Sequence, residues 1–268
     1  MKYLLLVLSF SLYASLTYGA LPASISDEQI NQYIEKIGLK DTFESLPDQM
    51  LAMGQQQKLT SSDPAAVDQS IQEIMAVWNI EDAMAITKAY IRDNSTKEQF
   101  SDLNEWQNSS LAKTMTGQEL QATQPNFQAD LMHYMGVLQT NPPKQEVVSA
   151  IQNLVKNTKM TDMTVELIVS IMKSMALATG DSETEKFETM IAQMKPMLAG
   201  QMNQQMIMTS FYIYRNVSTE QLNEYADFYK SELGQHELDL MWAAFNETFK
   251  DWSVKVGTQL KNKKLAAQ

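Results

Sequence analysis

The chain contains no cysteine, only two histidines and few of the residues that interrupt helices. The lack of cysteine excludes disulfides, thiolate metal sites, a cysteine nucleophile and a lipoprotein anchor. Phosphate-binding glycine loops and the Gly-x-Ser-x-Gly hydrolase motif are also missing. Nine glycines and seven prolines among 268 residues leave room for long elements, and strand-like alternation of Val, Ile and Thr is nearly absent.

The chain is strongly acidic, with a formal net charge of −11. An acidic surface repels nucleic acids and anionic lipids, which argues against both as partners. Hydrophobic residues make up 44% of the chain, which is enough for a packed core and too much for a disordered chain.

The first twenty residues resemble an export signal. Lys2 precedes an apolar run from Tyr3 to Leu16, and small residues end the segment at Gly19 and Ala20. The run is too short to cross about 30 Å of hydrocarbon. We therefore expect a signal peptide over residues 1–20, a mature chain without a transmembrane segment, and a periplasmic location, with secretion as the alternative.

Helical spacing and capping signals dominate the rest of the chain. Capping boxes are expected at Ser26, at Ser95 and at Ser218, each with Glu or Gln three residues later. Asn141-Pro142-Pro143 is the clearest internal break. The pattern predicts an all-α protein of ten to twelve helices, with no sheet.

The two halves of the chain resemble each other when one is shifted by 122 residues. Tyr90 then meets Tyr212, and Trp106 meets Phe228. Ser109 meets Ser231 in the same register. We interpret this as a duplication that gives a first helical unit over residues 21–141 and a second over residues 142–268.

The most specific motif of the second unit is a predicted corner between two helices. Ser218 is expected to cap a short helix that ends at Phe228, and Ser231 to cap the next helix. Gly234 would let the two helices approach closely. These four residues form a structural motif rather than a catalytic one, because Ser231 has no histidine base beside it.

This motif resembles an exported bacterial family of unknown function, catalogued as DUF-twenty-fifty-nine, through the run Phe228-Tyr229-Lys230-Ser231-Glu232-Leu233-Gly234. The resemblance implies a helical, exported protein, and it brings no catalytic residues.

Other candidate sites have simpler structural interpretations. His133 and His236 lack a second ligand at metal-binding spacing, and Glu237 beside His236 is interpreted as ordinary surface. Met190, Met194 and Met197 share a helix face and are interpreted as core. The alternatives are a Cu(I) thioether site and methionines exposed in a groove for apolar peptides or lipids. We expect no catalytic residues, no metal and no cofactor.

These observations favour a non-enzymatic periplasmic protein that binds a partner, either a protein segment or an apolar ligand. The expected groove lies beside the corner, lined by Tyr225, Tyr229, Met241 and Trp242. The alternatives are an enzyme whose site is assembled only by the fold, and methionine-based Cu(I) handling.

Overall fold

The computed structural model describes residues 25–59, 61–179 and 184–266. The predicted signal peptide, residues 1–20, lies outside this range. The described part is all-α, as predicted, and contains no strand. In chain order its elements are α1 (Asp27–Lys36), α2 (Leu39–Lys58), α3 (Pro64–Met75), α4 (Ile80–Asn94), α5 (Lys97–Asn108), α6 (Ser110–Glu119), the 3-10 turn η1 (Leu120–Thr123), α7 (Phe127–Thr140), α8 (Gln145–Asn157), α9 (Met160–Thr179), α10 (Thr184–Ile213), α11 (Thr219–Phe228) and α12 (Glu232–Ala266).

Side-chain caps set the starts of several helices. Complete capping boxes occur at Ser26 and Ser218, where the sequence predicts them. The third prediction was wrong by one residue: Thr96, not Ser95, caps α5, with Gln99 completing the box. Ser95 is the C-cap of α4, whereas the hydroxyl of Thr96 accepts from the amide of Gln99 and the Gln99 side chain accepts from the amide of Thr96.

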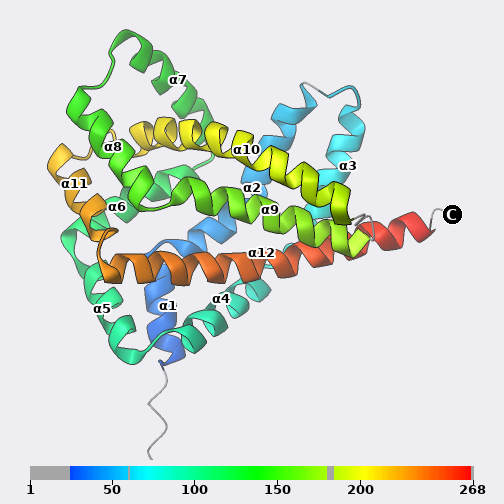
Figure 1. Cartoon of the computed structure of the whole chain (residues 1–268), viewed down its shortest axis with the longest axis horizontal. Helices are drawn as coiled ribbons and strands as arrows, with labels where there is room; N and C mark the ends of the chain where they lie inside the picture. The colour runs from blue at the N-terminus through cyan, green and yellow to red at the C-terminus, as the bar shows by residue number, and fades with distance from the viewer. Residues whose placement is uncertain (1–24, 60, 180–183, 267–268) are drawn as a thin grey trace, which may run out of the picture.

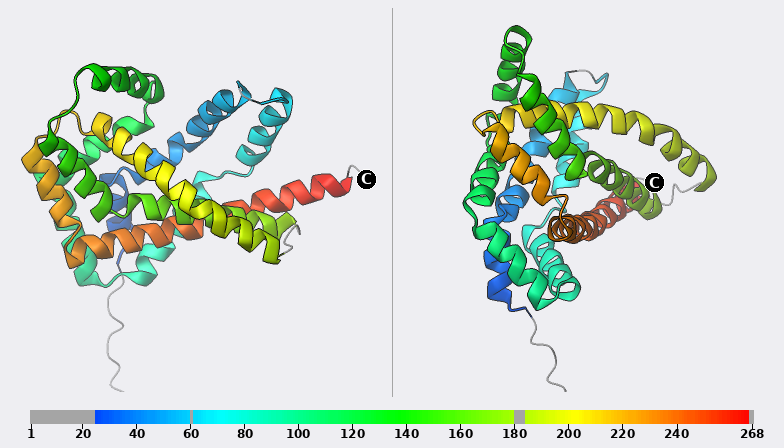
Figure 2. Two further views of the ribbon diagram at one scale, coloured as in Figure 1. Left: turned by 45° about the horizontal axis from the view of Figure 1, so that its top comes forward. Right: turned by 60° about the vertical axis from the view of Figure 1, so that its left-hand side comes forward.

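The long helix α12 lies at the centre of the arrangement (Figure 1). It packs along α9 on one side and along α4 on the other. The hairpin of α2 and α3 and the C-terminal end of α12 project from the rest in different directions, as the left view of Figure 2 shows.

Two hydrophobic clusters form the core, and each draws on both halves of the sequence. The first joins α1, α2, α4 and α5 to the middle of α12, through residues such as Leu240 and Trp252. The second joins α8, α11 and the end of α10 to α6, through Leu111 and Met115. Among the buried residues of the two clusters, α12 joins the core of the first half and α6 joins the core of the second.

The two halves contain similar elements in the same order along the chain. Each contains a capped short helix, α5 or α11, followed by a helix capped by Ser109 or Ser231. Residues with positive φ, Gly38 and Lys159, separate α1 from α2 and α8 from α9. These parallels support the predicted duplication, which stays a prediction.

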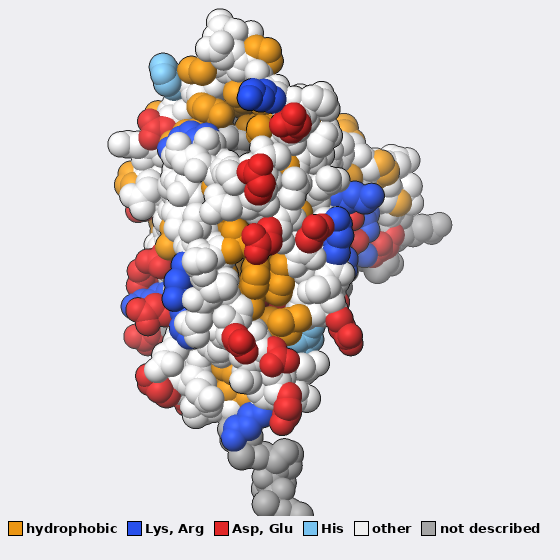
Figure 3. Space-filling model, turned by 90° about the vertical axis from the view of Figure 1, so that its left-hand side faces the viewer, with side chains coloured by type: hydrophobic (Ala, Val, Ile, Leu, Met, Phe, Trp, Pro, Cys, Tyr) orange, Lys and Arg blue, Asp and Glu red, His pale blue; other side chains and the backbone are white. Residues whose placement is uncertain are grey.

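The exposed surface is mixed in character. On the side where α8, α11 and α5 lie, acidic side chains are scattered around a central strip of hydrophobic ones (Figure 3). None of the described helices combines the length and the apolar character that a membrane span requires.

Candidate functional site

A pocket of about 380 Å³ opens between α9, α11 and α12. Its volume lies within the range of about 300–1,000 Å³ that is usual for small-molecule sites. Most of its wall is aliphatic or aromatic, and the lining residues are Glu119, Thr158, Met160, Met163, Thr164, Leu167, Tyr214, Tyr225, Tyr229, Leu238, Met241, Trp242, Phe245 and Phe249.

Most polar groups of the wall form one hydrogen-bonded patch, while the hydroxyls of Thr158 and Thr164 donate to the backbone carbonyls of Leu154 and Met160. The hydroxyls of Tyr214 and Tyr225 donate to Oε1 of Glu119, at 2.6 and 2.9 Å. The hydroxyls of Tyr225 and Tyr229 lie 3.3 Å apart. Because these four side chains are linked, a bound molecule meets its hydrogen-bonding groups in a single place on an otherwise apolar surface.

The carboxyl group of Glu237 is buried, whereas Glu119 is half-buried, and Glu237 belongs to the same tyrosine network. Its Oε1 accepts hydrogen bonds from the Tyr33 hydroxyl and from Nε2 of Gln107, both at 2.7 Å. Its Oε2 is buried and has no hydrogen-bond partner among the described residues. Tyr229 lies close enough to Glu237 to influence its pKa, so the two carboxyl groups are connected through tyrosines.

Burial raises the pKa of both carboxyl groups above the ordinary value for glutamate. For Glu119, the hydrogen bonds from Tyr214 and Tyr225 lower the pKa and so oppose the larger effect of burial. For Glu237, the negative charge of Glu119 adds to the increase. Burial also raises the pKa of Tyr225 and of Tyr229 well above the usual value, so both remain neutral donors.

The residues expected to form a groove lie together. Tyr225, Tyr229, Met241 and Trp242 all line this pocket. The sequence placed them beside the corner of α11 and α12 from helix periodicity alone. Whether they bind a ligand remains a proposal.

The corner itself has the contacts that the motif predicts. The amide of Gly234 donates to Oγ of Ser231 at 3.1 Å. A Cβ on Gly234 would lie 2.3 Å from the carbonyl oxygen of Phe228. Phe228 stacks on Trp106, with ring centroids 3.7 Å apart, so the two residues related by the 122-residue shift touch each other.

The sequence analysis missed both carboxyl groups of the site. The interpretation of Glu237 as surface was wrong, because the side chain is only 4% exposed. A signal was present in the helix spacing: Glu119 follows Leu111 and Met115 at intervals of four, and Glu237 follows Leu233 in the same way. A lone carboxylate on an apolar helical stripe is a candidate for burial, since such a stripe faces the core.

The methionine interpretation also needs correction. Met190 and Met197 are 44% and 59% exposed, so they are not core residues. The helix face that they share with Met194 turns largely outward from α10, because the buried side of this segment is set by Ile191.

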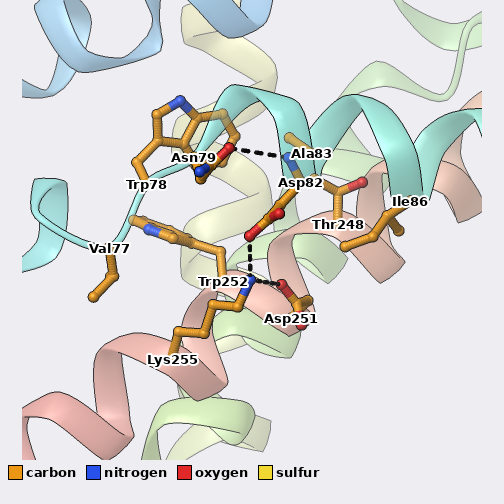
Figure 4. Close-up of a pocket in the computed structure, with 10 residues that line it drawn as sticks. All are labelled: Val77, Trp78, Asn79, Asp82, Ala83, Ile86, Thr248, Asp251, Trp252 and Lys255. Carbon is orange, nitrogen blue, oxygen red and sulfur yellow. Dashed lines mark hydrogen bonds and ion pairs between the residues drawn. The ribbon is translucent and has the colours of Figure 1, made fainter.

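A second concavity, between α4 and α12, is too small to hold a ligand (Figure 4). Its volume is about 10 Å³, which is near the size needed for one water molecule. Lys255 bridges Asp82 and Asp251 there, at 2.8 Å each. This cluster fastens α12 to α4.

No group of three or more His, Asp or Glu side chains in the described ranges is arranged to hold a metal ion. Comparison of the chain with protein-family models, with curated proteins and with solved structures found no match.

Proposed function

We propose that this is an exported, non-enzymatic binding protein of the periplasm, and that it takes a small amphipathic molecule in the pocket between α9, α11 and α12. The observation that carries the proposal is the composition of the pocket wall. Mostly apolar side chains surround one linked patch formed by Glu119 and the hydroxyls of Tyr214, Tyr225 and Tyr229. A few grouped polar atoms on an apolar wall are typical of sites that orient a small ligand.

The pocket favours a small molecule over a protein segment. Its lining is contributed by helices that also form the core, and extended peptides usually bind along open grooves or sheet edges. We therefore prefer the apolar ligand of the two partners that the sequence suggested.

Binding can be tested with the fluorescent apolar probe N-phenyl-1-naphthylamine and the mature chain. The wild-type protein should increase the probe's fluorescence saturably. Met163→Trp should weaken binding at least about tenfold, because the larger ring occupies part of the space that the probe would fill. Met132→Trp is the matched control, because Met132 is 73% exposed on α7, outside the pocket. Equal binding by both variants would refute the proposal.

Export is tested separately. The protein should be recovered from the periplasmic fraction of the expressing bacterium, with a mass that places the mature N-terminus after Gly19 or Ala20. Recovery of the uncleaved chain from the cytoplasm would contradict this part of the proposal.

An enzyme remains the second candidate, because two carboxyl groups with raised pKa lie near each other and one faces the pocket. A protonated Glu119 could act as a general acid. Small-molecule extracts incubated with the wild-type protein and with Glu119→Gln distinguish the two functions. Consumption of a compound by the wild type alone would favour the enzyme.

A further inference from the structure

We propose that the ligand carries a protonated amine, whose positive charge pairs with Glu119 while its hydrocarbon part lies in the pocket. This inference rests on the proposed binding function and names the chemical class of the ligand.

The first reason is that Glu119 lacks a positive partner. Among the described residues, none that line the pocket is a lysine or arginine, and no ion pair reaches Glu119. Both recorded hydrogen bonds are accepted by Oε1, so Oε2 is the oxygen left for a ligand. Carboxylates enclosed in protein are normally paired, and an ammonium group would supply the missing charge.

The second reason is that the ionisable group next to this network is acidic, since Tyr33 and Gln107 donate hydrogen bonds to the buried carboxyl group of Glu237. Glu237 is buried within the same tyrosine network, and its pKa responds to the charge of Glu119. A ligand carboxylate or phosphate would therefore meet two acidic groups and no cation. A cation is attracted by whichever of the two carboxyl groups is ionised, because the interaction of charges is strong where water is excluded.

The third reason is the aromatic content of the wall. Tyr225, Tyr229, Trp242, Phe245 and Phe249 all line the pocket. Aromatic rings attract cations through their negative faces, and Trp and Tyr do so more strongly than Phe. The same rings provide apolar contacts for a hydrocarbon chain, so one set of side chains suits both parts of an alkylamine.

Binding should also release a proton. Burial raises the pKa of Glu119, and an ammonium ion bound beside it favours the ionised carboxylate. The other groups that face this carboxyl are the neutral hydroxyls of Tyr214 and Tyr225 and the buried carboxyl of Glu237. Net proton release on binding is therefore a signature of the charge pair that a purely apolar contact would not produce.

The test compares decylamine, decanol and decanoate as competitors of N-phenyl-1-naphthylamine on the full mature chain. All three have the same chain length and differ in the head group. Decylamine should bind about tenfold more tightly than decanol, as expected for one charge-assisted contact, and decanoate should bind more weakly than decanol. Calorimetry in buffers of different ionisation enthalpy should detect proton release with decylamine alone.

Two variants distinguish pairing of the ligand's charge with Glu119 from a non-specific effect of losing one negative charge. Glu119→Gln keeps an oxygen for both tyrosines, so it should fold, and it should reduce decylamine affinity to that of decanol. Asp162→Asn removes one charge from an exposed position near the start of α9 and should leave the preference for decylamine unchanged.

The outcomes distinguish this inference from the proposed function. If all three competitors bind equally, or decanoate binds best, and Met163→Trp still blocks them, the amine inference is overturned while the binding function stands. If no competitor displaces the probe and Met163→Trp has no effect, the binding function fails and the inference fails with it.

Discussion

Glu237 shows how a single side chain can make stability depend on pH. Its carboxyl group is buried, accepts hydrogen bonds from Tyr33 and Gln107, and leaves one oxygen without a partner in the described structure. Burial raises its pKa, so the folded state favours the protonated form. The stability gained in this way is complete below the unfolded pKa and is lost as the pH rises through the folded pKa.

We predict that Glu237→Gln will flatten this dependence. The glutamine keeps an oxygen for Tyr33 and Gln107 but cannot ionise. The difference in unfolding free energy, variant minus wild type, should rise with pH above about 4.3, by up to about 1.4 kcal/mol per pH unit until the folded pKa is reached. Urea unfolding at pH 4, 5, 6, 7 and 8 measures it.

The control for this prediction is Glu224→Gln, which changes an exposed glutamate on α11. It should leave the pH dependence of the wild type unchanged. Parallel curves for Glu237→Gln and the wild type would show that Glu237 does not titrate differently in the folded and unfolded chains.

At the scale of elements, the corner of α11 and α12 depends on close backbone contact. A Cβ on Gly234 would lie 2.3 Å from the carbonyl oxygen of Phe228 and 2.9 Å from Cα of Tyr229. Both neighbours are backbone atoms, so α11 would have to move to make room.

We therefore predict that Gly234→Ala will destabilise the protein by about 1–3 kcal/mol, the usual cost of overpacking. Gly200→Ala is the matched control: Gly200 also lies within a helix, and nothing approaches its Cβ position within 4 Å. That change should stabilise α10 by roughly 0.5–1 kcal/mol through helix propensity. Urea unfolding of both variants checks the prediction, which a neutral Gly234→Ala would contradict.

Features encoded locally could be predicted from the sequence. The box at Ser218, the cap at Ser231 and the need for Gly234 depend on residues within a few positions of one another. Tyr225 and Tyr229 lie at the end of the first helix of that corner and Met241 and Trp242 on the second, so both pairs could be placed beside it from the sequence. Even here the exact first residue of a helix was uncertain. Ser95 and Thr96 are both suitable N-cap residues, and only the structure shows that Thr96 caps α5.

The carboxyl network could not be predicted in the same way. The Tyr33 hydroxyl and Glu237 are 204 positions apart, and Tyr225 and Glu119 are 106 apart. Such pairs depend on which helices become neighbours, and periodicity within one helix carries no information about its neighbour. The exposure of Met190 and Met197 was missed for the same reason. An apolar helix face in the sequence does not indicate whether another helix packs against it.

At the scale of the whole molecule, the predicted boundary between residues 141 and 142 divides the sequence into halves, but each hydrophobic cluster contains residues from both halves. The first cluster needs Leu240 and Trp252 from α12, and the second needs Leu111 and Met115 from α6. Independent domains each enclose a core of their own, whereas these halves share theirs.

We predict that residues 25–141 and residues 142–266, expressed separately, will not unfold cooperatively, and that mixing them will restore helical circular dichroism and a cooperative thermal transition. The control is the full chain, folded first and then cut at a protease site placed after Asn141, which should stay associated. A cooperative transition in the fragment 25–141 alone would show that it does not need α12.

Because α12 packs in the core of the first half and α6 in the core of the second, the two cores are completed in a fixed order during synthesis. The first half cannot finish its core until α12 has emerged, because α12 follows the other elements of that core in the chain. Contacts over such long separations slow folding, and the unfinished face of the first half stays open to solvent in the meantime. Newly made chains should therefore depend on chaperones that shield apolar surface, and a stalled chain lacking α12 should be degraded rather than accumulate.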